Sequence, residues 1–192
     1  MLLSFLNRKA PHKRRILHRG NLRDGVLLLS GLSAAGCSLD STGLAVGLGL
    51  LALGTCLNFV TKGILIRDTV LCNRGVYRIC RHPYYLSNFL VDISFCVISG
   101  NRYLILAYPF LFFWAYGPTF TIEETQLFQR YPEAYRDFLL TVPQVFPTAG
   151  FGRGVKEIVQ EFSWRRITRT EWIRVTRFWA MAMILLLIHE VR

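Results

Sequence analysis

Two polar clusters stand at the edges of long apolar runs and have the residue types for chemistry. The first is Arg81-His82-Pro83, directly before an apolar run that starts near Tyr84. Proline is favoured in the first turn of a helix, because its missing N–H would be unpaired there anyway, so Pro83 predicts a helix start. The unpaired N–H groups of such an end, with an arginine beside them, suit a carboxylate or phosphate. The alternative is that Arg81 and His82 only anchor the helix among lipid headgroups.

The second cluster is a pair of carboxylates, Glu123-Glu124, at the end of the next apolar run. Two adjacent carboxylates at a membrane boundary are costly to desolvate unless cations or hydroxyl groups face them. If the two apolar runs form a helical hairpin, both clusters lie at its open end. The spacing therefore predicts one site for a charged ligand, and the alternative is a solvated helix end.

The cysteines do not indicate a metal centre. The five have no C-x-x-C spacing, and most fall in or beside apolar runs; they are Cys37, Cys56, Cys72, Cys80 and Cys96. Neither a zinc site nor a disulfide framework is expected from this arrangement.

The composition is that of a membrane protein. Hydrophobic residues make up 52% of the 192 residues, and the mean hydropathy is +0.33, which is too apolar for an ordinary soluble domain. The net charge of +11 comes from basic residues that flank long uncharged runs and do not form one patch with interleaved aromatics. We therefore expect a lipid bilayer as the partner of this chain, and no nucleic acid.

The apolar runs predict an all-α fold, a polytopic transmembrane helical bundle. Four runs are predicted to span the membrane, at residues 25–39, 41–61, 84–99 and 103–122. A fifth helix is expected at 172–188, but its uncharged part covers only 178–188, so it either crosses the membrane or lies in the interface. Gly36-Cys37 also resembles a lipoprotein cleavage site, although the long basic region before it favours keeping the first run as a helix.

The distribution of basic residues orients the bundle. We divide the chain into a basic N-terminal segment (1–24), two spans (25–61), a core with a helical hairpin (62–147), and a basic linker with the final helix (148–192). With the N-terminus in the cytoplasm, all Lys and Arg residues except Arg102 and Arg192 lie on the cytoplasmic side. The candidate site is then cytoplasmic as well.

Two further predictions concern packing inside the bundle. Tyr85, Asn88 and Asp92 fall on one helical stripe, and an ionisable group at the depth of Asp92 is costly against lipid. We expect Asp92 to face the interior, more as a hydrogen-bonding partner of a neighbouring helix than as a catalyst. The small residues Gly43 and Gly47 are expected to let two helices approach closely.

The motifs between about residues 74 and 147 follow one order along the chain. The pattern is G-x-Y-x-x-x-R-H-P-x-Y, then a hydrophobic hairpin, E-E-x-x-L, a Y-P-E-A-Y turn and V-P-x-x-x-P. It is carried by Gly75, Tyr77, Arg81, His82, Pro83, Tyr85, Glu123, Glu124, Leu127, 131–135, Val142, Pro143 and Pro147. This ordered combination resembles the isoprenylcysteine carboxyl methyltransferases and phospholipid methyltransferases, which are integral membrane enzymes.

The resemblance implies methyl transfer from S-adenosylmethionine at the cytoplasmic membrane boundary. The positions that it implies for cofactor contact are Tyr77, His82, Pro83, Tyr84, Tyr85 and Glu123. Arg81 and Glu124 are the candidate catalytic residues. An amine acceptor would need a proton acceptor, for which Glu123 or Glu124 is nearest.

Two departures from the family pattern bear on the acceptor. Ser87 stands where family members commonly have glycine, and Thr119 stands where the isoprenylcysteine enzymes have an arginine that serves the substrate. We expect a lipid-like or small apolar acceptor: an isoprenylcysteine carboxylate, an amino-phospholipid or a thiol. Threonine cannot supply the bidentate contact of an arginine, which disfavours strict isoprenylcysteine specificity. The alternative function is a non-catalytic membrane scaffold or lipid-binding protein that retains the fold.

Overall fold

The computed structural model describes residues 19–65, 71–147 and 151–191, and all regular secondary structure within these ranges is helical. In chain order the helices are α2 (Arg19–Ala34), α3 (Ser41–Ile64), α4 (Val76–Ile79), α5 (Pro83–Ile98), α6 (Arg102–Arg130), α7 (Pro132–Thr141), α8 (Phe151–Glu161), the 3-10 helix η1 (Trp164–Arg166) and α9 (Arg169–Glu190). The prediction of an all-α bundle is confirmed for this part of the chain.

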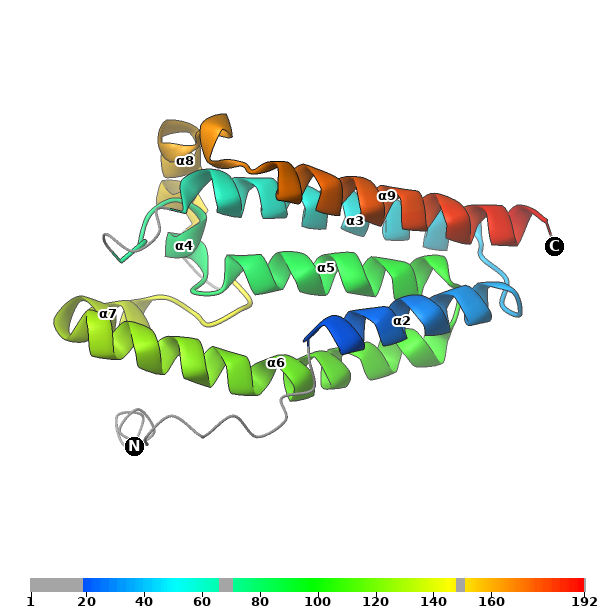
Figure 1. Ribbon diagram of the computed structural model, residues 1–192, viewed down its shortest axis with the longest axis horizontal. Helices are drawn as coiled ribbons and strands as arrows, with labels where there is room; N and C mark the ends of the chain where they lie inside the picture. Colours follow the sequence, from blue (N-terminus) through cyan, green and yellow to red (C-terminus); the bar gives the residue numbers. More distant parts are fainter. Residues whose placement is uncertain (1–18, 66–70, 148–150, 192) are drawn as a thin grey trace.

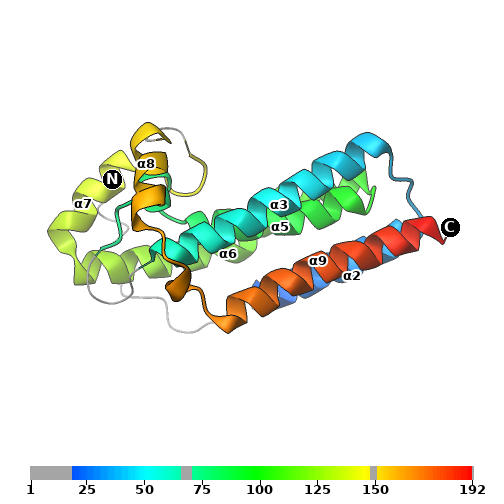
Figure 2. The same cartoon turned by 90° about the horizontal axis from the view of Figure 1, so that it is seen from above.

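The long helices share one direction and leave the short ones at one end. Figure 1 shows α2, α3, α5, α6 and α9 along the long axis, with α4, α7 and α8 gathered at one end of the bundle. The opposite end carries the α2–α3 connection, the α5–α6 turn and the end of α9. Seen from above, α2 and α9 lie beside the group formed by α3, α5 and α6 (Figure 2).

Among the described helices, α3, α6 and α9 are long and apolar enough to cross a membrane. The final helix, left open between a span and an interfacial helix, thus has the length of a span. The predicted first and third spans do not reach that length, because α2 and α5 have only 16 residues each. That is about 24 Å at the usual rise per residue. With three candidate spans in a helical bundle, the chain is an integral membrane protein.

The first helix starts and ends earlier than predicted. It begins at Arg19, inside the segment predicted as a basic tail, and it ends at Ala34, before the end of the apolar run. The N–H groups of Gly36 and Cys37 both donate to Ser33 O, which closes a turn in place of further helix. Residues 1–18 of the predicted basic segment lie outside the described residues.

The fourth predicted span is longer than its apolar run. Instead of ending at residue 122, α6 continues to Arg130, so Glu123 and Glu124 lie within the helix. The polar residues after 122 end the hydrophobic stretch but not the helical conformation. The helix ends at Tyr131, because Pro132 disfavours the α conformation for the residue before it.

Small residues set the contact between α3 and α5, the most extensive helix–helix interface that the structure describes. A Cβ added to Gly54 would lie 3.0 Å from Val91 N, and Gly47 approaches α5 in the same way. The prediction for Gly47 is confirmed. That for Gly43 is wrong, since a Cβ there would meet Asp40 Oδ1 at 2.8 Å. Asp40 caps the start of α3 and is not part of a neighbouring helix.

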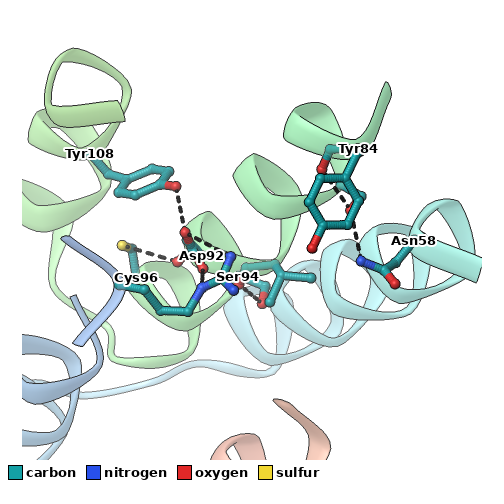
Figure 3. Close-up of polar contacts among 9 residues, drawn as sticks. Asn58, Tyr84, Asp92, Ser94, Cys96 and Tyr108 are labelled. Carbon is teal, nitrogen blue, oxygen red and sulfur yellow. Dashed lines mark hydrogen bonds and ion pairs between the residues drawn. The ribbon is translucent and has the colours of Figure 1, made fainter. Parts of the chain in front are cut away.

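Asp92 lies fully buried in the bundle, as predicted. Arg23 Nε donates a 2.7 Å hydrogen bond to Asp92 Oδ1, and Tyr108 Oη donates a 3.0 Å bond to Oδ2 (Figure 3). The carboxylate thereby joins α5 to α2 and to α6. Its contacts are with neighbouring helices, in keeping with a structural role.

The α2–α3 connection and the α5–α6 turn lie at the same end of the bundle. Gly100, in the α5–α6 turn, has a positive φ of 72°, and a Cβ there would lie 2.5 Å from Ser38 O in the α2–α3 connection. Asn101 Nδ2 also donates a 2.9 Å hydrogen bond to Ser33 Oγ. These contacts hold the far end of the bundle together.

Replacing Arg23 with methionine should destabilise the bundle, because the Asp92 carboxylate would remain buried without its counter-charge. We expect the free energy of unfolding to fall by about 3–5 kcal/mol, the usual cost of removing one partner of a buried ion pair. Thermal unfolding in detergent measures the effect, with Arg102→Met, at an exposed position, as the matched control. The double variant Arg23→Met/Asp92→Asn should recover part of the loss. A double variant as unstable as Arg23→Met would contradict the explanation.

Candidate functional site

The start of α5 positions the first cluster. Pro83 is the first residue of α5, as predicted, and His82 is the N-cap. The N–H groups of Arg81 and His82 donate to Pro143 O (2.8 Å) and Gln144 O (3.0 Å) in the loop after α7. These two backbone donors are therefore used within the chain.

One carboxylate oxygen of Glu124 contacts three polar groups. Oε1 lies 3.0 Å from His82 Nε2 and 2.9 Å from Arg81 Nη1, and it accepts a 3.0 Å hydrogen bond from Gln144 Nε2. Glu124 is buried on α6. The hairpin of α5 and α6 thus brings the two predicted clusters together, as the sequence pattern requires.

Arg81 keeps hydrogen-bonding capacity despite this ion pair. Its Nε and Nη1 atoms are buried and make no well-aligned hydrogen bond within the described part of the chain. The hydroxyl of Tyr135 on α7 is also buried, and it lies next to the Arg81 guanidinium. Burial and the negative charge of Glu124 raise the pKa of Tyr135, so the phenol is neutral and can donate. Buried donors left without acceptors are uncommon and are frequently completed by a ligand or ion.

Glu123 has a different environment from its neighbour. Its Oε1 accepts a short hydrogen bond from Tyr85 Oη, and its Oε2 lies 3.9 Å from His82 Nδ1. The side chain of Glu123 is 40% exposed, compared with 11% for Glu124. Glu123 is therefore the more accessible of the two carboxylates.

Aromatic rings line the interior next to the polar cluster. The His82 ring lies 5.0 Å from that of Phe120, between ring centroids, and Tyr85 lies 5.2 Å from Phe120 and 5.3 Å from Tyr116. These rings come from α5 and α6. The site thus combines charged groups with an aromatic wall.

The comparison with protein families agrees with this arrangement. Residues 46–129 match the model of the isoprenylcysteine carboxyl methyltransferase (ICMT) family. The match agrees with the resemblance predicted from the sequence, and the matched segment contains Arg81, His82, Tyr85, Glu123 and Glu124. Neither the curated proteins nor the solved structures compared with the chain gave a match. The family match supports a membrane methyltransferase.

The other residues implied by the ICMT resemblance lie around this cluster. Tyr77 is partly buried in the short helix α4, and Pro83 shapes the start of α5. The Tyr84 hydroxyl is directed to α9, where it accepts a 2.5 Å hydrogen bond from Arg174 Nη1. The Nζ atom of Lys62 lies 4.1 Å from the centroid of the Tyr84 ring. Tyr84 thus links the site to α3 and α9.

The two departures from the ICMT pattern occupy buried positions. Ser87 is fully buried; its hydroxyl donates to Tyr84 O (3.0 Å) and accepts a 3.4 Å hydrogen bond from Asn58 Nδ2 of α3 (Figure 3). The added hydroxyl is therefore accommodated in the α3–α5 interface. Thr119 is buried on α6, one turn before Glu123.

The helix α8, outside the segment matched by the ICMT model, docks on α4. Glu157 Oε2 accepts hydrogen bonds from Gly75 N (2.8 Å) and Arg78 Nε (3.1 Å). Gly75 has a positive φ of 56°, which favours glycine. Burial opposes ionisation of Glu157, but the hydrogen bonds and the positive charge of Arg78 outweigh it and lower its pKa. This contact fixes the turn that precedes Tyr77.

Sequence reasoning missed three residues that complete the site. Tyr135 and Gln144 fall inside the Y-P-E-A-Y and V-P-x-x-x-P motifs, which signal that these segments matter but not which side chain reaches the cluster. Glu157 lies in no motif, and its partner Arg78 is far away along the chain. Its role depends on the docking of α8.

The cysteine of this region is not poised as a nucleophile. Burial raises the pKa of Cys80 to about 12, so its thiol is protonated at neutral pH. Among the described residues there is also no group of three or more His, Cys, Asp and Glu side chains that could hold a metal ion.

The contact between α8 and α4 should depend on pH through Glu157. Because its pKa is lowered in the folded protein, the contact contributes fully above the ordinary glutamate pKa and is lost as the pH falls through the lowered value. Protection of the Gly75 amide against hydrogen exchange, corrected for the intrinsic rate, should fall in that acidic range.

Glu157→Gln should weaken this protection at neutral pH and remove its pH dependence. Glu133→Gln, at an exposed glutamate on α7, is the control and should change neither. Gly75 protection that is the same in Glu157→Gln and in the unmodified chain would show that the carboxylate does not hold α8 on α4.

Proposed function

We propose that this chain is an S-adenosylmethionine-dependent integral membrane methyltransferase that acts on a lipid-like or small apolar acceptor. The observation that carries the proposal is the cluster at the open end of the α5–α6 hairpin. There Glu124 meets Arg81 and His82, and Glu123 meets Tyr85, within the segment that matches the ICMT family.

The charges of the cluster complement those of S-adenosylmethionine. Its methionine part carries a carboxylate and an ammonium group, and its sulfur is a sulfonium cation. The Arg81 guanidinium, whose Nε makes no well-aligned hydrogen bond within the described part of the chain, suits the carboxylate, and the accessible Glu123 suits the ammonium group. The rings of Tyr85 and Phe120 offer aromatic faces for a cation.

Glu124 then acts as a positioning residue. Its Oε1 already faces Arg81, His82 and Gln144, so this oxygen is poorly placed to accept a further proton. It fixes the directions of the Arg81 and His82 side chains. If the acceptor is an amine, Glu123 is the better proton acceptor of the two.

When bound, the cofactor supplies a methyl group on sulfur for an in-line displacement. The chain's contribution is to align the acceptor and to exclude water. The buried Phe120 and Tyr116 provide an apolar interior next to the polar cluster. This apolar interior would favour methylation of a thiolate or carboxylate. The negative charge of such an acceptor and the positive charge of the sulfonium cancel as the methyl group moves, so a low dielectric does not oppose the reaction.

We place the site on the cytoplasmic side of the membrane. Arg102 is the one described Lys or Arg residue at the end of the bundle with the Gly100 turn. Of the remaining described Lys and Arg residues, Arg23 lies within the bundle, paired with Asp92, and most of the others belong to α4, α7, α8, η1 and the segments that adjoin them, at the end that carries the site. The positive-inside rule assigns such an end to the cytoplasm.

Loss of His82 or Glu123 should weaken cofactor binding. We expect His82→Ala and Glu123→Ala each to lower the affinity for S-adenosylmethionine roughly tenfold or more, the effect of losing a hydrogen bond to a charged group. Equilibrium binding to the purified chain in detergent measures this, with Glu133→Ala as the control. Unchanged affinity in both variants would refute the site. No binding by the unmodified chain would favour the non-catalytic scaffold.

The acceptor should not be strictly an isoprenylcysteine. Thr119 is buried and cannot replace the bidentate contact of an arginine, so a farnesylated cysteine analogue should be methylated more slowly than amino-phospholipids or small thiols. A competition assay, in which these acceptors compete for the labelled methyl group of S-adenosylmethionine, measures the order of their methylation rates. Faster methylation of the farnesylated analogue would contradict this preference. Thr119→Arg should raise activity on that analogue, provided that the variant still binds the cofactor.

A further inference from the structure

A hollow lies between α2 and α9, separate from the Glu123–Glu124 cluster. These two helices border an open groove with a volume of about 630 Å³. Its volume falls within the usual range for small-molecule sites. Figure 1 shows that α2 and α9 are separated where they begin and approach each other toward the end of α2.

The lining of this groove changes along the helix axis. Along α9, Arg174 and Arg177 come before Met181 and Ile184, so the arginines lie nearer the end that carries the candidate site. The apolar residues Leu27, Met181 and Ile184 lie further toward the opposite end, where Ile184 is close to Ala35. Since a helix rises 1.5 Å per residue, Arg174 and Ile184 are about 15 Å apart along α9. A cationic end followed by an apolar stretch of this length matches the headgroup and the upper acyl chain of a lipid.

The charges at the cationic end are not fully balanced. Arg174 pairs with Glu171, but Glu171 also lies 3.4 Å from Lys62 Nζ, so one carboxylate faces two cations. Arg177 is exposed and makes no ion pair with any residue that the structure describes. The remaining charged groups of the lining are Arg23, which is committed to Asp92, and the exposed Asp24.

We propose that the groove between α2 and α9 binds an anionic phospholipid. Its phosphate accepts hydrogen bonds from Arg177 and Arg174, and its acyl chain lies along Leu27, Met181 and Ile184. A zwitterionic lipid with the same chains binds more weakly, because its own cation offsets the phosphate. The proposal does not rest on methyl transfer, since none of these residues belongs to the Glu123–Glu124 cluster.

Native mass spectrometry of the full chain released from neutral detergent tests the proposal. The protein is equilibrated with equal amounts of phosphatidylglycerol and phosphatidylcholine that carry the same acyl chains. We expect preferential retention of phosphatidylglycerol. Arg177→Gln should lower the apparent affinity for it roughly fivefold, as expected for one basic residue near an anionic lipid. Arg165→Gln makes the same charge change at an exposed arginine of η1, outside the groove, and should have no effect.

A second pair of variants tests the apolar part. Ala180 lines the groove and is exposed, so Ala180→Phe should fill the space for the acyl chain without disturbing the core and should reduce retention of both lipids. Ala107→Phe, at an exposed position on α6, is the control for added bulk. Equal retention of the two lipids by the unmodified chain would overturn the proposal. So would equal effects of Arg177→Gln and Arg165→Gln, or full retention by Ala180→Phe.

Discussion

An ionised side chain inside a membrane bundle must find its counter-charge within the protein, because the surrounding lipid offers none. Two of the buried carboxylates in the described part of the chain illustrate that constraint. Asp92 meets Arg23 and Tyr108 in the middle of the bundle, and Glu124 meets Arg81 at its end. Each contact joins helices that are otherwise held mainly by apolar packing. The first fixes α2 against α5 and α6, and the second fixes the hairpin of α5 and α6 around the candidate site.

The same constraint gives two neighbouring glutamates different tasks. Successive residues of a helix point about 100° apart, so when Glu124 faces the interior, Glu123 turns toward the edge of the bundle. Glu124 is held by three groups from two other segments of the chain, Arg81 and His82 before α5 and Gln144 after α7. Glu123 shares its hydrogen bond with Tyr85 and keeps a large exposed fraction. One carboxylate can therefore organise the site while the other stays available to a ligand.

The elements outside the hairpin connect the site to the rest of the molecule. On one side, α8 holds the turn at Gly75 through Glu157. On the other side, the Tyr84 hydroxyl receives a hydrogen bond from Arg174, which also lines the groove between α2 and α9. A lipid headgroup at Arg174 would thus lie one side chain away from the start of α5. The candidate site and the proposed lipid groove are physically connected, although each is inferred from a different set of residues.

The sequence by itself determined that the chain forms membrane helices, where most of them lie, and that the hairpin joins Arg81 and His82 to the glutamates. Hydropathy, helix length and the position of Pro83 are local properties, and they are sufficient for those conclusions. The tertiary structure decided which groups pair. Arg23 and Asp92 are 69 positions apart, and Gln144 reaches Glu124 only because the loop after α7 folds back onto the start of α5. It also decided that α2 begins at Arg19 and that α6 continues to Arg130, since partners on other helices stabilise polar residues that a hydropathy pattern places outside the spans.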